Sequence, residues 1–99
     1  MLFSWFDAKE ATDFGVALAD TLVSKFPATE ENRKKKTIAK QMHVIQVVLA
    51  KAQQFRLGAK LNFYKKAKLG NAFRWRLTDL GYDKDFVDEL TKEVLLALN

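Results

Sequence analysis

The sequence predicts an all-α protein, a small single-domain bundle of about four helices with a central second helix. Its 99 residues correspond to one domain. Apolar residues recur at helical spacing, with no sustained two-residue alternation and no Asn-Gly or Asp-Gly hairpin turn. Pro27, Gly58 and Gly81 fall at the breaks between these apolar patterns. We therefore expect helices at about 7–26, 29–57, 62–80 and 84–98.

The first expected helix begins at a capping residue and carries a row of small side chains. Asp7 can cap its N-terminus, with Glu10 as the capping-box partner. Small side chains on its apolar side would let another helix approach closely, because interaxial distance follows side-chain size. These small residues are Ala8, Ala11, Gly15 and Ala19. Phe6 is expected to act as a hydrophobic staple, and Trp5 to cover the end of the bundle.

The second expected helix has the widest apolar face. Thr29 can cap it, and Gly58 supplies a left-handed stop. Its apolar positions span roughly half the circumference, more than a peripheral helix needs, so we expect it to pack on two sides. Val47 falls outside this face and is either a lone exposed valine or part of a dimer contact. The face consists of Ile38, Met42, Val44, Ile45, Val48, Leu49, Ala52 and Phe55.

The third expected helix, with Asn62 as cap and Gly81 after its end, divides into two faces of different chemistry. The expected core face comprises Phe63, Ala67, Gly70, Phe73, Leu77 and Leu80. We interpret Gly70 as a close crossing point, with the small face of the first helix as its candidate partner. The second face is a narrow stripe of Tyr64, Lys68, Asn71 and Trp75, with Lys65 and Arg76 beside it.

The fourth expected helix ends in a segment that is apolar nearly all round. Asp83 can cap this helix, and Asp85 places negative charge where the helix dipole favours it. The terminal sequence VLLAL, residues 94–98, is unusual for a free chain end. We expect it either to be covered by another helix or to pair with a second subunit.

No group of residues in the sequence is arranged for catalysis. There is no cysteine, and His43, the only histidine, lies on the polar side of its helix without metal-binding partners at i±4. Asp85, Glu89 and Glu93 form an i, i+4, i+8 ladder that could hold Mg²⁺ but is more typical of a solvated helix face. We therefore expect no enzymatic activity, no cofactor, no metal and no small-molecule substrate.

Positive charge is concentrated in the middle of the chain. The net charge is +5, and residues 28–82 carry 13 Lys and Arg against three Asp and Glu, whereas both ends are acidic. The basic run of Arg33, Lys34, Lys35 and Lys36 is either a solvated first turn of the second helix or a contact for phosphate or an acidic partner.

The stripe on the third helix admits three interpretations. Tyr64, Lys68 and Trp75 could be buried within one chain, could lie in a homodimer interface, where Trp, Tyr and Arg are enriched, or could stack on bases beside a phosphate backbone. Lys65 and Arg76, which border the stripe, favour an interface over deep burial. These cations do not choose between a protein and a nucleic acid as the partner.

The leading functional hypothesis is a non-enzymatic interaction module that self-associates as a dimer through Trp75, Val47 and the C-terminal leucines. The alternative is a nucleic-acid-binding module that uses Arg33–Lys36, Lys65, Lys68 and Arg76. No apolar run approaches the ~18 residues of a membrane span, and the acidic first helix would be repelled by anionic lipid, so we expect no membrane partner. The absence of cysteine suits a reducing compartment, and we expect a cytoplasmic protein.

Overall fold

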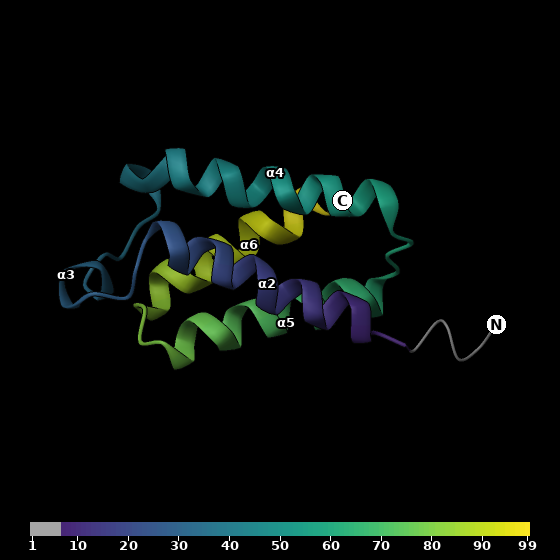
Figure 1. The fold of residues 1–99 in the computed structure, drawn as a ribbon, viewed down its shortest axis with the longest axis horizontal. Coiled ribbons are helices and arrows are strands. Elements are labelled where there is room, and N and C mark those ends of the chain that lie inside the picture. Colours follow the sequence, from purple (N-terminus) through teal and green to yellow (C-terminus); the bar gives the residue numbers. More distant parts are fainter. Residues whose placement is uncertain (1–6) are drawn as a thin grey trace.

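The computed structural model describes residues 7–99, which form an all-α bundle without a strand in that range and confirm the predicted fold class (Figure 1). The expected roles of Trp5 and Phe6 fall outside the described residues. Of the helices in residues 7–99, none combines the length and apolar character that a transmembrane span requires. The elements are α2 (Lys9–Lys25), α3 (Glu30–Arg33), the 3₁₀ helix η1 (Ala39–Gln41), α4 (Met42–Gly58), α5 (Phe63–Asp79) and α6 (Lys84–Ala97).

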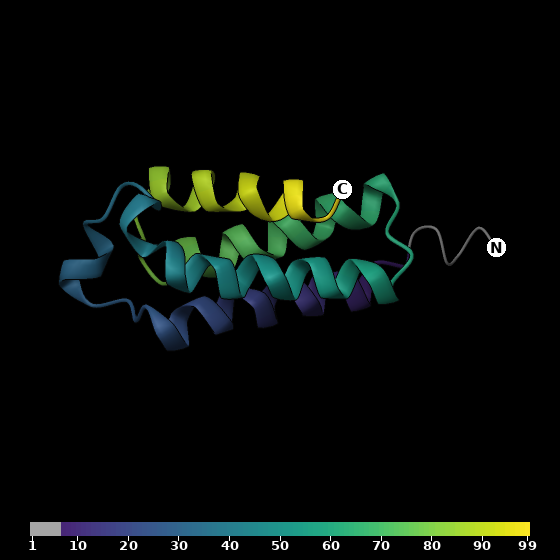
Figure 2. The same ribbon diagram turned by 90° about the horizontal axis from the view of Figure 1, so that it is seen from above.

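The four long helices form a ring in the order α2, α4, α6, α5 (Figures 1 and 2). Helices α2 and α5 run in one direction, and α4 and α6 run in the other. The wide apolar face of α4 is therefore covered on two sides, by α2 and α6, as expected. Each of the other long helices also packs against two neighbours, so no single helix is central.

The connector 59–62 joins two helices that lie diagonally across the bundle. Helices α4 and α5 are antiparallel, as a short connection predicts, but they do not pack against each other. The backbones of Ala59 and Asn62 are extended. Five extended steps reach about 17 Å, which is enough to cross the diagonal of helices packed 8–10 Å apart, about 13 Å.

The expected helix 29–57 is interrupted, which corrects the sequence prediction. Thr29 caps α3, accepting a hydrogen bond from the Asn32 amide (3.1 Å), but this helix stops after one turn. A run of cations at a helix N-terminus opposes the dipole and repels itself, which disfavours continued helix here. The chain then turns inward, because buried Ile38 donates its amide to Glu89 Oε1 of α6 (2.8 Å).

The helix ends agree with the predicted caps in most places. Asn62 and Asp83 accept hydrogen bonds from the amides of Lys65 and Asp85, each at 2.8 Å, and so cap α5 and α6. Gly81 follows α5 with φ of +92°. Two expectations are wrong. Gly58 is the last residue of α4 rather than a left-handed stop, and α2 has Ala8 at its N-cap, although Asp7 still accepts the Lys9 amide (3.2 Å).

The closest helix contact in the described fold is between α2 and α5. A Cβ placed on Gly15 would lie 2.4 Å from the carbonyl oxygen of Leu69 and 3.1 Å from Cβ of Ala72. The neighbouring Ala11 and Ala19 are buried as well, so the small face of the first helix does allow the approach that its sequence predicts. Gly70 does not face this contact, because it packs under Leu95 of α6.

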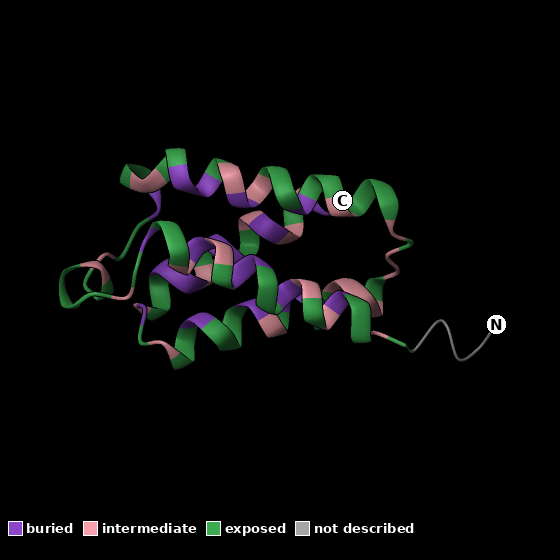
Figure 3. Ribbon diagram, in the orientation of Figure 1, coloured by how far each residue is buried: buried purple, intermediate pink, exposed green. Residues whose placement is uncertain are grey.

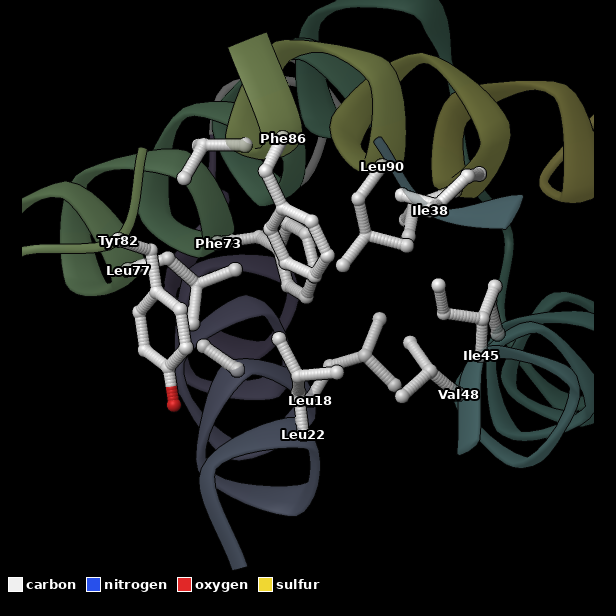
Figure 4. Packing of buried hydrophobic residues seen from close by; sticks show 14 of the residues in the cluster. Leu18, Leu22, Ile38, Ile45, Val48, Phe73, Leu77, Tyr82, Phe86 and Leu90 are labelled. Carbon is white, nitrogen blue, oxygen red and sulfur yellow. The ribbon is translucent and has the colours of Figure 1, made fainter. Parts of the chain in front are cut away.

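The core lies among all four long helices (Figures 3 and 4). On α5 the buried side is Leu69, Gly70, Phe73 and Leu77. The sequence placed Phe63 and Ala67 on this side, but both are exposed, so the core face is rotated toward Leu69, closer to α2. At one end of the core Phe26, Tyr82 and Phe86 stack on one another, with the Tyr82 hydroxyl donating to the Phe26 carbonyl.

The apolar C-terminal segment is mostly covered within the chain. Val94 and Leu98 are buried, and Leu95 packs on Gly70 of α5, so the first of the two expectations, cover by other helices, describes these three residues. Leu96 remains 55% exposed.

Adding one methyl group to Gly15 and to Gly70 should have opposite consequences. The new Cβ of Gly15→Ala meets a backbone carbonyl that cannot move aside, so we expect a loss of about 2 kcal/mol or more despite the helix-propensity gain of about 1 kcal/mol. The new Cβ of Gly70→Ala meets the flexible end of Leu95 at 2.9 Å, and we expect a change within about 1 kcal/mol. Urea unfolding measures both. Equal destabilisation of the two variants would contradict the assigned α2–α5 contact.

Thr91 carries the one fully buried side-chain polar atom without a hydrogen-bond partner in residues 7–99. Leaving such a hydroxyl unpaired costs about 1–3 kcal/mol, and valine has nearly the same shape. We therefore expect Thr91→Val to stabilise the fold by about 1 kcal/mol or more, raising Tm by about 4–8 °C per kcal/mol. Exposed Thr78→Val is the matched control and should change stability by less than about 0.5 kcal/mol. A lower Tm for Thr91→Val would show that the hydroxyl has a partner in solution.

Candidate interaction surface

The stripe predicted on the third helix is present on the solvent side of α5. Tyr64 is half-buried, Lys68 and Asn71 are exposed, and the Trp75 side chain is 66% exposed. The Lys68 Nζ lies 5.5 Å from the centre of the Tyr64 ring, a cation–π contact. We call Tyr64, Lys68, Asn71 and Trp75 the α5 outer stripe. The interpretation in which these side chains are buried within one chain is wrong for Trp75.

Helix α2 adds a second exposed apolar side chain beside this stripe. Gly15 and Ala72 face each other across the α2–α5 contact. Val16 is the next residue of α2 and is 37% exposed, and Trp75 lies one turn beyond Ala72 on α5. Both side chains therefore border the same helix–helix contact on its solvent side. We call this surface the α2–α5 outer face.

The α2–α5 outer face pairs an acidic helix with a basic one. Arg76 Nε lies 3.0 Å from Asp20 Oδ1 and links α5 to α2. Both side chains are about half exposed, so this ion pair contributes little to stability. It forms a further contact across the α2–α5 pair, beside the close approach at Gly15. Arg76, one of the predicted partner-binding cations, is therefore engaged within the chain.

The basic run is used largely inside the fold. Arg33 Nε donates to the Leu80 carbonyl (3.1 Å) and lies directly over Gly81. Lys36 Nζ lies 3.4 Å from Asp83 Oδ2, so these two cations attach the end of α3 and the segment after it to the turn between α5 and α6. The other two are less constrained. Lys34 lies 3.8 Å from Glu30, and Lys35 is half-buried.

The basic run and the start of the α5 outer stripe lie at opposite ends of the bundle. Arg33 contacts Leu80, whereas Tyr64 is 16 residues earlier on α5. At a rise of 1.5 Å per residue this corresponds to about 24 Å along the helix axis. The structure therefore does not bring the basic run beside the Tyr64 ring, and the predicted partner-binding residues do not form one compact site.

The residues weighed as catalytic or metal-binding candidates have ordinary surroundings. His43 is exposed on α4. Glu89, in the middle of the carboxylate ladder, accepts the Ile38 amide. Within residues 7–99 no three His, Cys, Asp or Glu side chains gather closely enough to hold a metal ion.

Several exposed apolar residues were not predicted to be exposed. The clearest are Leu57 (80% exposed) and Phe63 (86%), which lie on either side of the connector 59–62. Helical spacing placed Phe63 with the core, but the first residue of a helix lies at the end of the bundle, where the other helices do not cover it. Their positions next to Gly58 and the cap residue Asn62 were the available signal.

No protein-family model, curated protein or solved structure matches this chain. Any function must therefore be argued from the surfaces described above.

Asp83 should make stability depend on pH in the acid range. Partial desolvation acts to raise the pKa of this carboxyl, but the amides of Asp85 and Phe86 and the Lys36 ammonium outweigh it and hold the pKa below its ordinary value. The stabilisation is therefore present above the unfolded-chain pKa of about 3.9 and is lost as pH falls through the lower folded pKa. In Asp83→Asn the amide can still cap α6 but does not ionise.

Thermal unfolding of both proteins from pH 7 to pH 2 measures this effect. The Tm of the natural chain should exceed that of Asp83→Asn modestly at pH 7, and the difference should shrink below about pH 4. A difference that stays constant over this range would show that the carboxylate does not contribute through its charge.

Proposed function

We propose that this chain is a non-enzymatic helical interaction module that self-associates as a dimer through the α2–α5 outer face. The observation that carries the proposal is the 66% exposure of Trp75, a large apolar side chain on the solvent side of a helix whose opposite side fills the core. Tryptophan is enriched at the energetic centre of protein interfaces. Val16 beside it enlarges the apolar surface.

The sequence also predicted that Val47 and the C-terminal leucines take part in this contact. Val47 is half-buried in its own bundle and Leu98 is buried, so neither offers much surface to a partner. Leu96 is exposed, but it belongs to α6, across α5 from α2. We therefore assign the dimer contact to Trp75 and Val16.

Charge favours one geometry for the dimer. Helix α5 carries five Lys and Arg against Asp79 alone, so stacking α5 on α5 of the partner would oppose like charges. A two-fold axis parallel to the helices, running above the α2–α5 contact, instead places each α5 over α2 of the partner. Helix α2 carries Glu10, Asp13 and Asp20 against its two lysines. This geometry also brings Trp75 of one copy toward the partner's α2, where Val16 is exposed.

Nucleic-acid binding remains the alternative, and fewer observations support it. Arg33 and Lys36 would have to give up Leu80 and Asp83 to bind phosphate, and Arg76 would have to leave Asp20. Lys68 already lies over the Tyr64 ring. A cytoplasmic location is also part of the proposal, supported by the absence of cysteine.

Sedimentation velocity between about 1 and 100 µM tests self-association. We expect a monomer–dimer equilibrium that Trp75→Ser weakens about 30-fold or more, since interface tryptophans typically contribute 2 kcal/mol or more. Met42→Ser is the matched control, because Met42 is 39% exposed on α4, the helix diagonal to α5. A natural chain that stays monomeric at 100 µM would rule out the dimer.

The geometry of the dimer has its own test at Val16. Both Val16→Lys and Val16→Glu remove the apolar side chain. Only the lysine would place a like charge against the basic α5 of the partner. We expect Val16→Lys to weaken the dimer more than Val16→Glu does, and the difference to shrink in high salt. The reverse order would contradict the stacking of α5 on the partner's α2.

A further inference from the structure

The two most exposed large apolar side chains of the described residues lie at one end of the bundle. Leu57 (80% exposed) is in the last turn of α4, and Phe63 (86% exposed) is the first residue of α5. Both helix ends meet at the connector 59–62, opposite the end that holds α3 (Figure 1). We call residues 56–66 the tip. Exposed apolar patches that are rimmed by polar residues are typical of sites that bind a protein or a membrane.

The tip is also strongly basic. Arg56, Lys60, Lys65 and Lys66 flank the two apolar residues in the sequence, which contains no Asp or Glu from residue 56 to residue 78. Lys66 donates to the side-chain oxygen of Asn99 (3.1 Å), a neutral acceptor that leaves its charge uncompensated. Arg56 donates to the main-chain oxygen of Asn99. Within residues 7–99, no Asp or Glu side chain forms an ion pair with any of these four cations.

Acidic residues at the start of α2 and just before it lie near one side of the tip. Asp7 and Glu10 line a groove of about 260 Å³ together with Phe55, Lys60 and Lys65. An adjoining groove of about 450 Å³ adds Asp13 and Lys9 beside the same Lys65. The three carboxylates offset part of the positive charge. With Arg56 and Lys66 included, the end of the molecule remains net positive.

We propose that the tip binds the surface of an anionic lipid bilayer. Leu57 and Phe63 enter the boundary between headgroups and acyl chains, and the surrounding cations lie at the level of the lipid phosphates. Apolar insertion combined with charge attraction is the pairing of signals that reversible surface binding needs. Neither helix spans the bilayer. The molecule stands on the membrane by one end.

The two apolar side chains distinguish lipid from nucleic acid. Phe63 could stack on a base, but Leu57 has no aromatic face for stacking and no polar atom that reads a base. Both side chains gain from burial in the acyl boundary. From the sequence we expected no membrane partner, because anionic lipid would repel the acidic first helix. The tip, however, is formed by the ends of α4 and α5, which are basic.

The inference does not depend on the dimer proposed above. The tip and Trp75 are separate surfaces, since Phe63 and Trp75 are 12 residues apart on α5, about 18 Å along its axis. A dimer with its two-fold axis parallel to the helices would place both tips at the same end. Such a dimer would bind a membrane with both tips, and more tightly than a monomer does.

Vesicle co-sedimentation of the full chain tests the proposal. We expect binding to phosphatidylcholine vesicles containing 30% phosphatidylglycerol, little binding to phosphatidylcholine alone, and loss of binding as salt rises. Leu57→Ser and Phe63→Ser should each lower the partition coefficient about tenfold or more, because tenfold is only 1.4 kcal/mol, less than full burial of either side chain. Both residues are so exposed that the fold should survive, and circular dichroism checks it.

Two further variants separate lipid binding from self-association and report whether the tip inserts into the bilayer. Trp75→Ser should leave the monomer's partition coefficient unchanged, so loss of self-association and loss of lipid binding can be told apart. Phe63→Trp should bind and be quenched by lipids brominated along the acyl chain, which reports insertion directly. For this measurement the other two tryptophans, Trp5 and Trp75, are replaced by Phe.

Three outcomes would overturn the proposal. The natural chain could fail to bind anionic vesicles at low salt. The Leu57→Ser, Phe63→Ser double variant could bind as well as the natural chain. Binding could require Phe3, Trp5 and Phe6 instead, as shown by a triple serine variant, in which case residues 1–6 and not the tip would hold the lipid.

Discussion

The fold depends on how closely α2 approaches α5. The Leu69 carbonyl occupies the position that a side chain at residue 15 would fill, so the two backbones can meet only because that residue is glycine. Buried alanines on either side of Gly15 extend the contact along both helices. Because α2 and α5 run in the same direction, the chain cannot join them by a short turn. It must pass through α4 first, and the connector 59–62 must then cross the bundle diagonally. The exposed tip is a consequence of that crossing.

At the other end of the bundle the chain reverses direction twice, after α2 and between α5 and α6. Phe26 ends α2 and stacks with Tyr82 and Phe86, so the exit from α2 and the turn into α6 share one aromatic cluster. Burial raises the pKa of the Tyr82 phenol, with nearby Arg33 acting in the opposite direction, so the hydroxyl stays protonated as a donor to Phe26 at neutral pH. Arg33 and Lys36 hold the intervening segment over the same turn. Two of the four cations of the basic run, Arg33 and Lys36, therefore form contacts within the fold.

The sequence predicted most of the features that depend on local order, although the Asp7 cap and the Gly58 stop were wrong, and it failed where distant segments compete. The caps at Thr29, Asn62 and Asp83 are read from a few neighbouring residues, and they were correct. The interruption of helix 29–57 was missed, because the hydrogen bond from Ile38 to Glu89 joins residues 51 positions apart. The α5 outer stripe was predictable from helical spacing, but the core boundary on α5 depends on which helices flank it. A rotation toward α2 brought Leu69 in and left Phe63 out. The partners of Arg33 and Arg76 within the chain could not be predicted either, because they lie 47 and 56 positions away in the sequence.

The fold converts one basic stretch of sequence into three environments with different capacities for binding. Arg33 and Lys36 are anchored at one end, and Arg76 is paired with α2 along the side. The cations at 56–66 form no ion pair within residues 7–99, although Asp7 and Glu10 lie near two of them, and they share a segment with the most exposed apolar side chains. From net charge alone, all of these cations would be predicted to bind a polyanion equally well. Where a cation already has a carboxylate or carbonyl, binding an anion must replace that contact, so the gain is small. At the tip, Arg56 and Lys66 donate to Asn99, whereas Lys60 and Lys65 form no ion pair within residues 7–99. On an anionic and apolar surface, the cations of the tip would gain from charge, and exposed Leu57 and Phe63 would gain from burial.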